Sequence, residues 1–98
     1  MVFFSHGSGE QSLNLGISND MRLMAIIGNN AYYSNEAISF NGLHQVEYVM
    51  EADADERLTT ISFYDGTKSI GRAQHQGLYP LKADNLAHRR RACLPVGP

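Results

Sequence analysis

The stretch from Ala37 to Ala73 constrains the fold most, because apolar and polar residues alternate along it between short turn signals. Side chains in a β-strand point alternately to two faces of the sheet, so this alternation predicts antiparallel strands with one apolar face. We expect four strands, over residues 36–40, 44–52, 57–64 and 67–73. Their inward side chains would be Ile38, Phe40, Val46, Tyr48, Met50, Ile61, Phe63 and Ile70.

Turn signals set the expected register of these strands. Asp65-Gly66 is typical of a two-residue hairpin, because glycine adopts the positive φ angle that such turns need. A four-residue loop over 53–56 and a three-residue bulged loop at Asn41-Gly42 keep the other apolar residues on the same face, since a slip of one residue would turn a whole strand over. The expected pairs are Val46 with Phe63, Tyr48 with Ile61, Ile61 with Ile70 and Ile38 with Val46.

The opposite face of this sheet is expected to be mostly polar. It carries Glu47, Glu51, Thr60, Ser62, Thr67 and Ser69, together with Val49, Leu58 and Tyr64. A solvated face is the simpler interpretation, and a binding surface is the alternative. The two glutamates argue against nucleic acid on this face, because phosphate contacts need Lys and Arg.

The two ends of the chain are expected to differ from this central stretch. Residues 13–17 alternate and predict a short strand, residues 19–27 fit a strand slightly better than a helix, and residues 1–12 contain little to anchor them. After Gly77, Pro80 and Pro95 enclose a segment with apolar residues at helical spacing, which predicts a C-terminal helix. Its apolar stripe is thin, so this helix would cover only part of the apolar face of the sheet.

The sequence therefore predicts an α+β fold in a single domain over residues 1–98, namely an antiparallel β-meander of four to six strands with a C-terminal helix packed on one face. The alternative is an N-terminal helix with a small bent β-barrel. A chain of 98 residues buries a smaller share of its surface than a larger domain does. Since the helix would leave apolar surface uncovered, we expect a homo-oligomer, either a dimer or a larger assembly.

Charge is distributed unevenly along the chain. Residues 1–78 contain four Lys/Arg and nine Asp/Glu, a net charge of −5, whereas residues 79–98 contain four Lys/Arg and one Asp, a net charge of +3. An acidic body with a basic end favours self-association or an anionic partner. The lone Cys93 excludes an internal disulfide, and neither a signal peptide nor a long apolar run is visible. We therefore expect a soluble protein of the bacterial cytoplasm that does not contact a membrane.

For function, the sequence favours a non-enzymatic binding or interaction module. Its partner would be a small apolar ligand or another protein, bound between sheet and helix or between subunits. The residues expected to line this site are Phe40, Tyr48, Phe63 and Tyr79. Aromatic side chains on an incompletely covered apolar face are typical of such pockets.

The alternative function is a nucleic-acid-directed protein, such as a small toxin-like ribonuclease. Phosphate contacts would come from the basic residues Lys82, Arg89, Arg90 and Arg91. The weak catalytic candidates are His75, Arg72, Asp65 and Tyr64, which would supply a base, a cation and hydrogen-bonding groups. The same residue types occur at any polar edge of a sheet, so the non-enzymatic interpretation is preferred.

No pattern in the sequence indicates a metal or a cofactor. None of the histidines, His6, His44, His75 and His88, has a partner at a ligand spacing, and Cys93 lacks a second cysteine. The acidic run from Glu47 to Glu56 lacks the glycine turn and the distal glutamate of a calcium loop. We therefore expect no cofactor and no dedicated metal site.

Overall fold

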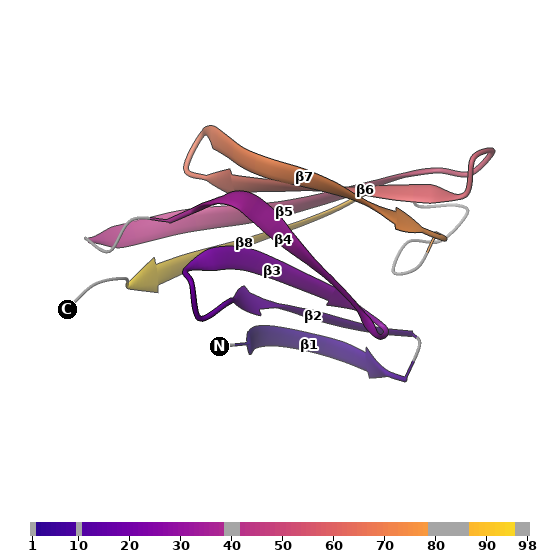
Figure 1. Cartoon of the computed structure of the whole chain (residues 1–98), viewed down its shortest axis with the longest axis horizontal. Helices are drawn as coiled ribbons and strands as arrows, with labels where there is room; N and C mark the ends of the chain where they lie inside the picture. The colour runs from indigo at the N-terminus through magenta and orange to yellow at the C-terminus, as the bar shows by residue number, and fades with distance from the viewer. Residues whose placement is uncertain (1, 10, 39–41, 79–86, 96–98) are drawn as a thin grey trace.

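All regular structure in the described residues is β. The computed structural model describes residues 2–9, 11–38, 42–78 and 87–95, and these residues form eight strands. The strands are β1 (Val2–Ser8), β2 (Gln11–Ile17), β3 (Arg22–Ile27), β4 (Asn30–Ala37), β5 (Leu43–Asp53), β6 (Leu58–Asp65), β7 (Lys68–Gln76) and β8 (Ala87–Pro95). They form two four-stranded antiparallel sheets, in the orders β1-β2-β3-β4 and β7-β6-β5-β8. Figure 1 shows the sheets as two layers, with β4 rising from the first sheet toward β7 of the second.

The predicted α+β class is wrong, because the described part of the chain contains strands and no helix. Residues 87–95, expected within the C-terminal helix, form β8 and pair with β5 from Leu43↔Pro95 to Glu51↔Ala87. Beside β5 this segment gains a continuous ladder of backbone hydrogen bonds, and such tertiary pairing overrides a weak local helical spacing. Residues 79–86, which the helix prediction also used, lie outside the described residues.

The alternative of an N-terminal helix with a small bent barrel is also wrong, because β1, β2 and β3 occupy residues 2–27 and the strands form two separate sheets. The short strand predicted over 13–17 is confirmed by β2, and the preference for a strand over 19–27 is confirmed by β3. The segment with little to anchor it contains β1, which pairs with β2 from Val2↔Gly16 to Ser8↔Gln11.

The predicted register of the β5–β6 hairpin is wrong by two residues. Tyr48 lies opposite Phe63 rather than Ile61, and Val46 lies opposite Asp65 rather than Phe63. Because a shift of two residues preserves the alternation, every side chain stays on its predicted face. The buried face of this hairpin was therefore predicted correctly, although the individual partners were not.

The cause of this shift is the hydrogen bonding of the turn. The Asp53 carboxylate accepts hydrogen bonds from the backbone N–H of Asp55, at 2.9 Å, and of Glu56, at 3.2 Å. Asp53 thus acts as the last residue of β5, opposite Leu58, and the loop runs over residues 54–57 instead of 53–56. Arg57 closes the loop with a φ angle of 53°, in the left-handed region.

Two differences overturn the predicted pairing of Ile61 with Ile70. The predicted turn at Asp65-Gly66 is wrong by one residue, because Asp65 pairs with Lys68 and the turn residues are Gly66 and Thr67. In addition, β7 contains a bulge. Tyr64 pairs with Ser69 and Phe63 pairs with Gly71, so Ile70 is the extra residue of the bulge. Ile61 consequently lies opposite Ala73. Ile70 still points into the core, as predicted, with 3% of its surface exposed.

The predicted hairpin between a strand over 36–40 and β5 is wrong as well, and residues 39–41 lie outside the described residues. β4 ends at Ala37 and pairs with β3, so the chain passes from one sheet to the other between β4 and β5 instead of making a hairpin. Ile38 is buried at this crossing, and its backbone N–H donates to the carbonyl oxygen of Met21 at 2.8 Å. Burial of Ile38 was predicted correctly, but its expected partner Val46 belongs to the other sheet.

The core lies between the two sheets. Its buried residues are Leu13, Leu15, Ile17, Leu23, Ala25, Ile27, Ile38, Val46, Tyr48, Met50, Ile61, Phe63 and Ile70. Tyr48 and Phe63 pack edge to face, with 5.9 Å between ring centres, and the Tyr48 hydroxyl donates to the carbonyl oxygen of Gly16 at 2.7 Å. Burial raises the pKa of Tyr48 above its ordinary value. The apolar face predicted for the second sheet is therefore covered by another sheet of the same chain.

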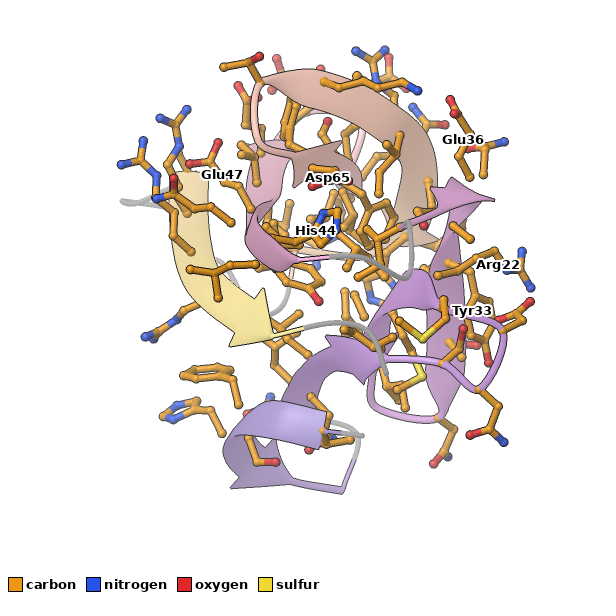
Figure 2. The ribbon with its side chains drawn as sticks, turned by 90° about the vertical axis from the view of Figure 1, so that its left-hand side faces the viewer. Arg22, Tyr33, Glu36, His44, Glu47 and Asp65 are labelled. Carbon is orange, nitrogen blue, oxygen red and sulfur yellow. The ribbon has the colours of Figure 1, made fainter. Side chains whose placement is uncertain are left out.

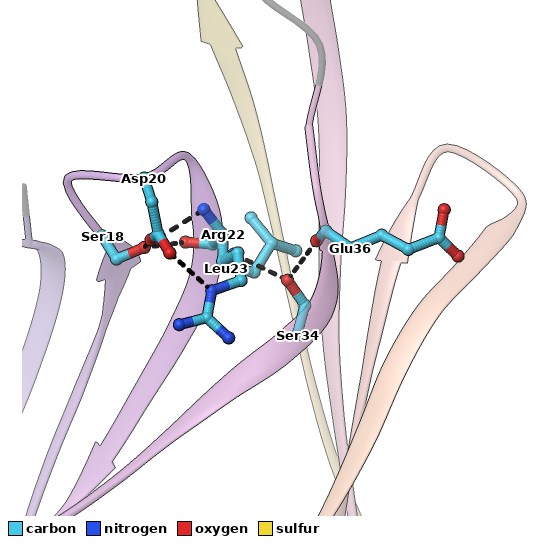
Figure 3. A network of polar contacts seen from close by, with 6 residues as sticks. All are labelled: Ser18, Asp20, Arg22, Leu23, Ser34 and Glu36. Carbon is cyan, nitrogen blue, oxygen red and sulfur yellow. Dashed lines mark hydrogen bonds and ion pairs between the residues drawn. The ribbon is translucent and has the colours of Figure 1, made fainter.

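A buried serine holds β4 where its pairing with β3 is interrupted. The register shifts between Arg22 and Met24. Here the Ser34 hydroxyl accepts a hydrogen bond from the backbone N–H of Leu23 at 3.0 Å and donates to the carbonyl oxygen of Glu36 at 2.7 Å (Figure 3). Because Ser34 is fully buried, its hydroxyl supplies the partners that the interrupted ladder lacks.

Beyond this irregularity β4 lies beside β7 and joins the two sheets along one side. The Asn35 side-chain oxygen accepts a hydrogen bond from the backbone N–H of Arg72 at 3.3 Å, and Lys68 Nζ lies 3.1 Å from Glu36 Oε1. We call these interactions, together with the approach of Asn35 to Gly71, the β4–β7 contact.

Candidate binding site

The outer face of the second sheet gathers most of the polar side chains that the sequence placed opposite the core. Side chains alternate along each strand, so residues that point away from the core on four adjacent strands form one surface. They are Gln45, Glu47, Val49 and Glu51 on β5, Thr60, Ser62 and Tyr64 on β6, Arg72 and Gln74 on β7, and Arg89 and Arg91 on β8. We call this surface the outer face.

Glu47 is the organising residue of the outer face. It is paired across strands with Arg91 on β8 and with Tyr64 on β6. The Nε–H of Arg91 donates to Glu47 Oε2, and Nε of Arg89 lies 3.7 Å from the same oxygen. Figure 2 shows Glu47 on the side of the sheet where β8 runs.

Exposure differs sharply within this group of charges. The Glu47 side chain is only 16% exposed, whereas those of Arg89 and Arg91 are 58% and 59% exposed. The Glu47 carboxylate accepts a hydrogen bond from Arg91, and its ion pairs with Arg91 and Arg89 are screened less by water than those of a fully exposed carboxylate. Glu47 therefore fixes the direction of Arg91, whose outer end faces solvent, and attracts Arg89 beside it.

A hollow of about 470 Å³ opens beside this group. It is lined by Gln45, Glu47, Tyr64, Gly66, Thr67 and Arg91. Its volume lies within the range of ordinary small-molecule sites, about 300–1,000 Å³. Most of its lining residues carry a hydrogen-bonding side chain, and the Tyr64 ring supplies an aromatic wall. We call it the Glu47–Arg91 hollow.

Two further hollows occur on the described surface. One, of about 360 Å³, continues along the outer face and is lined by Val49, Glu51, Ala87 and Arg89. The other, of about 230 Å³, lies at the β3–β4 turn and is lined by Ile27, Gly28, Asn29, Asn30 and His75. The Glu47–Arg91 hollow is larger than both of them.

The residues predicted to line an apolar site do not meet at a surface. Tyr48 and Phe63 are fully buried in the core, where they contact each other. Phe40 and Tyr79 lie outside the described residues. The predicted helix, which would have formed one wall of the site, is replaced over residues 87–95 by β8.

The three consecutive arginines do not form one basic patch. Because β8 is a strand, Arg89 and Arg91 point to the outer face and Arg90 points to the other side. There the Arg90 guanidinium lies over the Phe4 ring of β1, 4.0 Å from its centre. Lys82, the fourth basic candidate, lies outside the described residues.

The weak catalytic candidates are placed at separate positions. Arg72 and Tyr64 belong to the outer face, whereas His75 and Asp65 point toward the other side of the sheet. Asp65 Oδ1 lies 2.9 Å from Nδ1 of His44, and Figure 2 shows these two residues together, away from Glu47. The structure therefore does not bring His75 to Asp65 or to Tyr64.

His75 contacts the first sheet instead. Its Nδ1 lies 2.7 Å from the Tyr32 hydroxyl of β4, and the two rings are edge to face with centres 5.5 Å apart. His75 is 8% exposed, and burial lowers its pKa below the ordinary value for histidine. This contact adds to the β4–β7 contact and has a clear structural role.

The buried imidazole gives a pH-dependent stability whose sign follows from its lowered pKa. The unfolded chain takes up a proton near pH 6.5, whereas folded His75 resists protonation, so the unfolded state binds more protons below that pH. We expect the free energy of unfolding to fall as the pH is lowered from about 7.5 to about 5.5, by at most about 1.4 kcal/mol per pH unit from this group. Urea denaturation across this pH range measures the slope.

The matched variants for this measurement are His75→Asn and His6→Asn. His75→Asn should flatten the dependence, because asparagine keeps a hydrogen-bonding atom near Nδ1 but does not titrate. His6 is exposed on β1, so His6→Asn should retain the dependence. Equal slopes for the original protein and His75→Asn would assign the pH effect to other groups.

The sequence predicted the outer face but not the Glu47 arrangement. The available signal was the run Arg89-Arg90-Arg91. If this segment is a strand, the first and third arginines point to one face and the second to the other. The helical interpretation of the segment hid this signal. The partner of that strand, β5, is more than thirty residues away in the sequence, and no local pattern identifies it.

Comparison of the chain with protein-family models, with curated proteins and with solved structures found no match. Among the described residues, no group of three or more His, Cys, Asp or Glu side chains is arranged to hold a metal ion. The same part of the chain contains no helix able to cross a membrane.

Proposed function

We propose that this protein is a non-enzymatic binding module whose ligand occupies the Glu47–Arg91 hollow on the outer face. The observation that carries the proposal is a mostly covered carboxylate, Glu47, that holds the Nε–H of the exposed Arg91 at the border of a hollow of about 470 Å³. A solvated sheet face needs no such arrangement, whereas a binding site needs polar groups held in fixed directions.

Binding is favoured over catalysis because acid–base groups do not converge on this hollow. A general base must reach the proton it abstracts within hydrogen-bond distance. Glu47 already accepts from Arg91, and the histidines His44 and His75 are engaged with Asp65 and Tyr32 on the other side of the sheet. The hollow thus offers recognition by charge and hydrogen bonding without an evident reactive group.

The proposal keeps the class of function expected from the sequence and changes its site. An apolar ligand between sheet and helix is replaced by a ligand on a polar face, because the apolar side chains form the core between the two sheets. Homo-oligomerisation stays a prediction that native mass spectrometry can test. Its original reason, an apolar sheet face with too little cover, does not hold for the described residues.

The test is NMR titration of ¹⁵N-labelled protein with five probes of different charge: phenyl phosphate, benzoate, benzyl alcohol, benzylamine and maltose. We expect at least one probe to shift the amide signals of Gln45, Glu47, Tyr64, Gly66, Thr67 and Arg91. The amides of Gly28, Asn29 and Asn30, at the β3–β4 turn, serve as the internal control and should not move. Shifts confined to that turn, or no shift with any probe, would contradict the proposal.

Nucleic-acid binding is the second candidate, because Arg72, Arg89, Arg91 and Tyr64 share the outer face. Single-stranded nucleic acids combine phosphate contacts with stacking on an aromatic ring. Glu47 and Glu51 lie on the same face and reduce its net charge to one positive unit. We rank this candidate lower, since a polyanion would have to pass both carboxylates.

A further inference from the structure

We infer that the ligand of the Glu47–Arg91 hollow carries an oxyanion, either a phosphate or a carboxylate group, which Arg91 binds. This inference rests on the proposed function and names the chemical class of its ligand. Arg91 uses its Nε–H to bind Glu47, and no partner occupies its terminal nitrogens among the described residues.

A guanidinium group has two edges that can bind an oxyanion. One edge contains Nε–H and a terminal N–H, and the other contains the two terminal nitrogens. With the first edge held by Glu47, the second is directed away from the carboxylate and is pre-oriented for a bidentate contact. The 59% exposure of the Arg91 side chain leaves this edge accessible from solvent.

Local charge favours an anion in this hollow. Arg91 and Arg89 both lie against Glu47, so the three residues together carry one positive charge. The carboxylate is already neutralised by direct ion pairing, and the field at the outer ends of the arginines is therefore positive. A cationic ligand would be repelled there, and a neutral ligand would not use the charge.

The neighbouring hollow provides a contrast within the same face. It is lined by Arg89 and by Glu51, and Glu51 forms no ion pair with any described residue. An anion placed there would meet an unneutralised carboxylate. The preference for an anion therefore applies to the Glu47–Arg91 hollow and not to the whole face.

The remaining lining residues define the rest of the ligand. Gln45 and Thr67 add an amide and a hydroxyl to the lining of the hollow, and both are exposed. Tyr64 is half-buried and offers a ring face against which a planar or apolar group can pack. The volume of about 470 Å³ suits a small molecule rather than a polymer. A small planar molecule with one anionic group fits these features.

The experiment measures dissociation constants by NMR for phenyl phosphate, benzoate, benzyl alcohol, inorganic phosphate and a short oligothymidine. The two variants are Arg91→Gln and the matched control Arg72→Gln, which removes the same charge from the same face outside the hollow. We expect phenyl phosphate or benzoate to bind more tightly than benzyl alcohol. Arg91→Gln should weaken this binding by about tenfold or more, and Arg72→Gln by less than about twofold. Circular dichroism of both variants checks that the sheets are intact.

Each outcome decides the inference. Tighter binding of phenyl phosphate would identify a phosphate ligand, and tighter binding of benzoate a carboxylate ligand. Equal losses in the two variants, or binding of oligothymidine with shifts across the whole outer face, would show general attraction to a basic surface and overturn it. Benzyl alcohol binding as tightly in the hollow would overturn the oxyanion but leave the binding module standing. If no probe affects the hollow, both the inference and the proposed function fail.

Discussion

Replacing Gly71 with alanine is expected to lower the free energy of unfolding by about 3 kcal/mol or more, a large share of the roughly 5–15 kcal/mol that stabilises a small domain. A Cβ atom at this position would lie 2.4 Å from the backbone nitrogen of Asn35, 2.6 Å from its Oδ1 and 2.9 Å from the Cα of Ser34. These are mostly backbone atoms of β4, which cannot rotate away. The φ angle of 156° adds conformational strain for a residue with a side chain.

The matched control is Gly66→Ala in the β6–β7 turn. Gly66 also has a positive φ angle, 65°, but an added Cβ atom would meet nothing within 4 Å. We expect this variant to lose only about 1 kcal/mol, the usual penalty for alanine in the left-handed region. Thermal denaturation followed by circular dichroism compares the two. Similar losses would mean that the close approach of β4 to β7 does not hold in solution.

The Gly71 position shows where prediction from the sequence ended. The alternation along β5 and β6 predicted correctly which side chains face the core, because the face of a residue depends only on its parity along the strand. It did not predict that Val49 and Ser62, on the opposite face, are buried as well. The close approach of Asn35 to Gly71 depends on the bulge at Ile70 and on the interrupted pairing at Ser34. Both are places where the alternation of side chains along the strand is interrupted, and a prediction based on regular alternation cannot detect them.

The prediction of a C-terminal helix was wrong for a different physical reason. The helical spacing of this segment was a local signal, and its true partner β5 is distant in the sequence. Pairing with β5 satisfies the backbone groups of β8 and turns Arg89 and Arg91 to one side. The same error prevented prediction of the candidate site. Glu47 was correctly predicted to point outward, but the arginines that it binds were assigned to a helix. The apolar face of the second sheet was also predicted to be covered by this helix. It is covered by the first sheet, whose strands β1, β2 and β3 each have only a weak pattern in the sequence.

Phe63→Ala is the second variant with a large expected effect, a loss of about 3–5 kcal/mol in the free energy of unfolding. Phe63 has no exposed surface and contacts Tyr48 edge to face between the two sheets. Removing the ring leaves a cavity that the sheets cannot close, since each is fixed by its own hydrogen-bond ladder. Phe63→Leu retains most of the buried volume and should lose about 1.5 kcal/mol or less.

The sequence alone did not decide whether Phe63 is buried within one chain or between two subunits. Phe63→Ala distinguishes these two possibilities. If Phe63 belongs to a core within one chain, Phe63→Ala keeps the native mass of the original protein, and its urea midpoint depends on protein concentration no differently from that of the original protein. If Phe63 lies between subunits, the original protein gains stability with concentration and the variant loses both that dependence and its higher mass. Denaturation at two protein concentrations, with native mass spectrometry of both proteins, makes the distinction. We expect the first result, because Ile61, Met50 and Tyr48 surround the same interface between sheets and all are fully buried within a single chain.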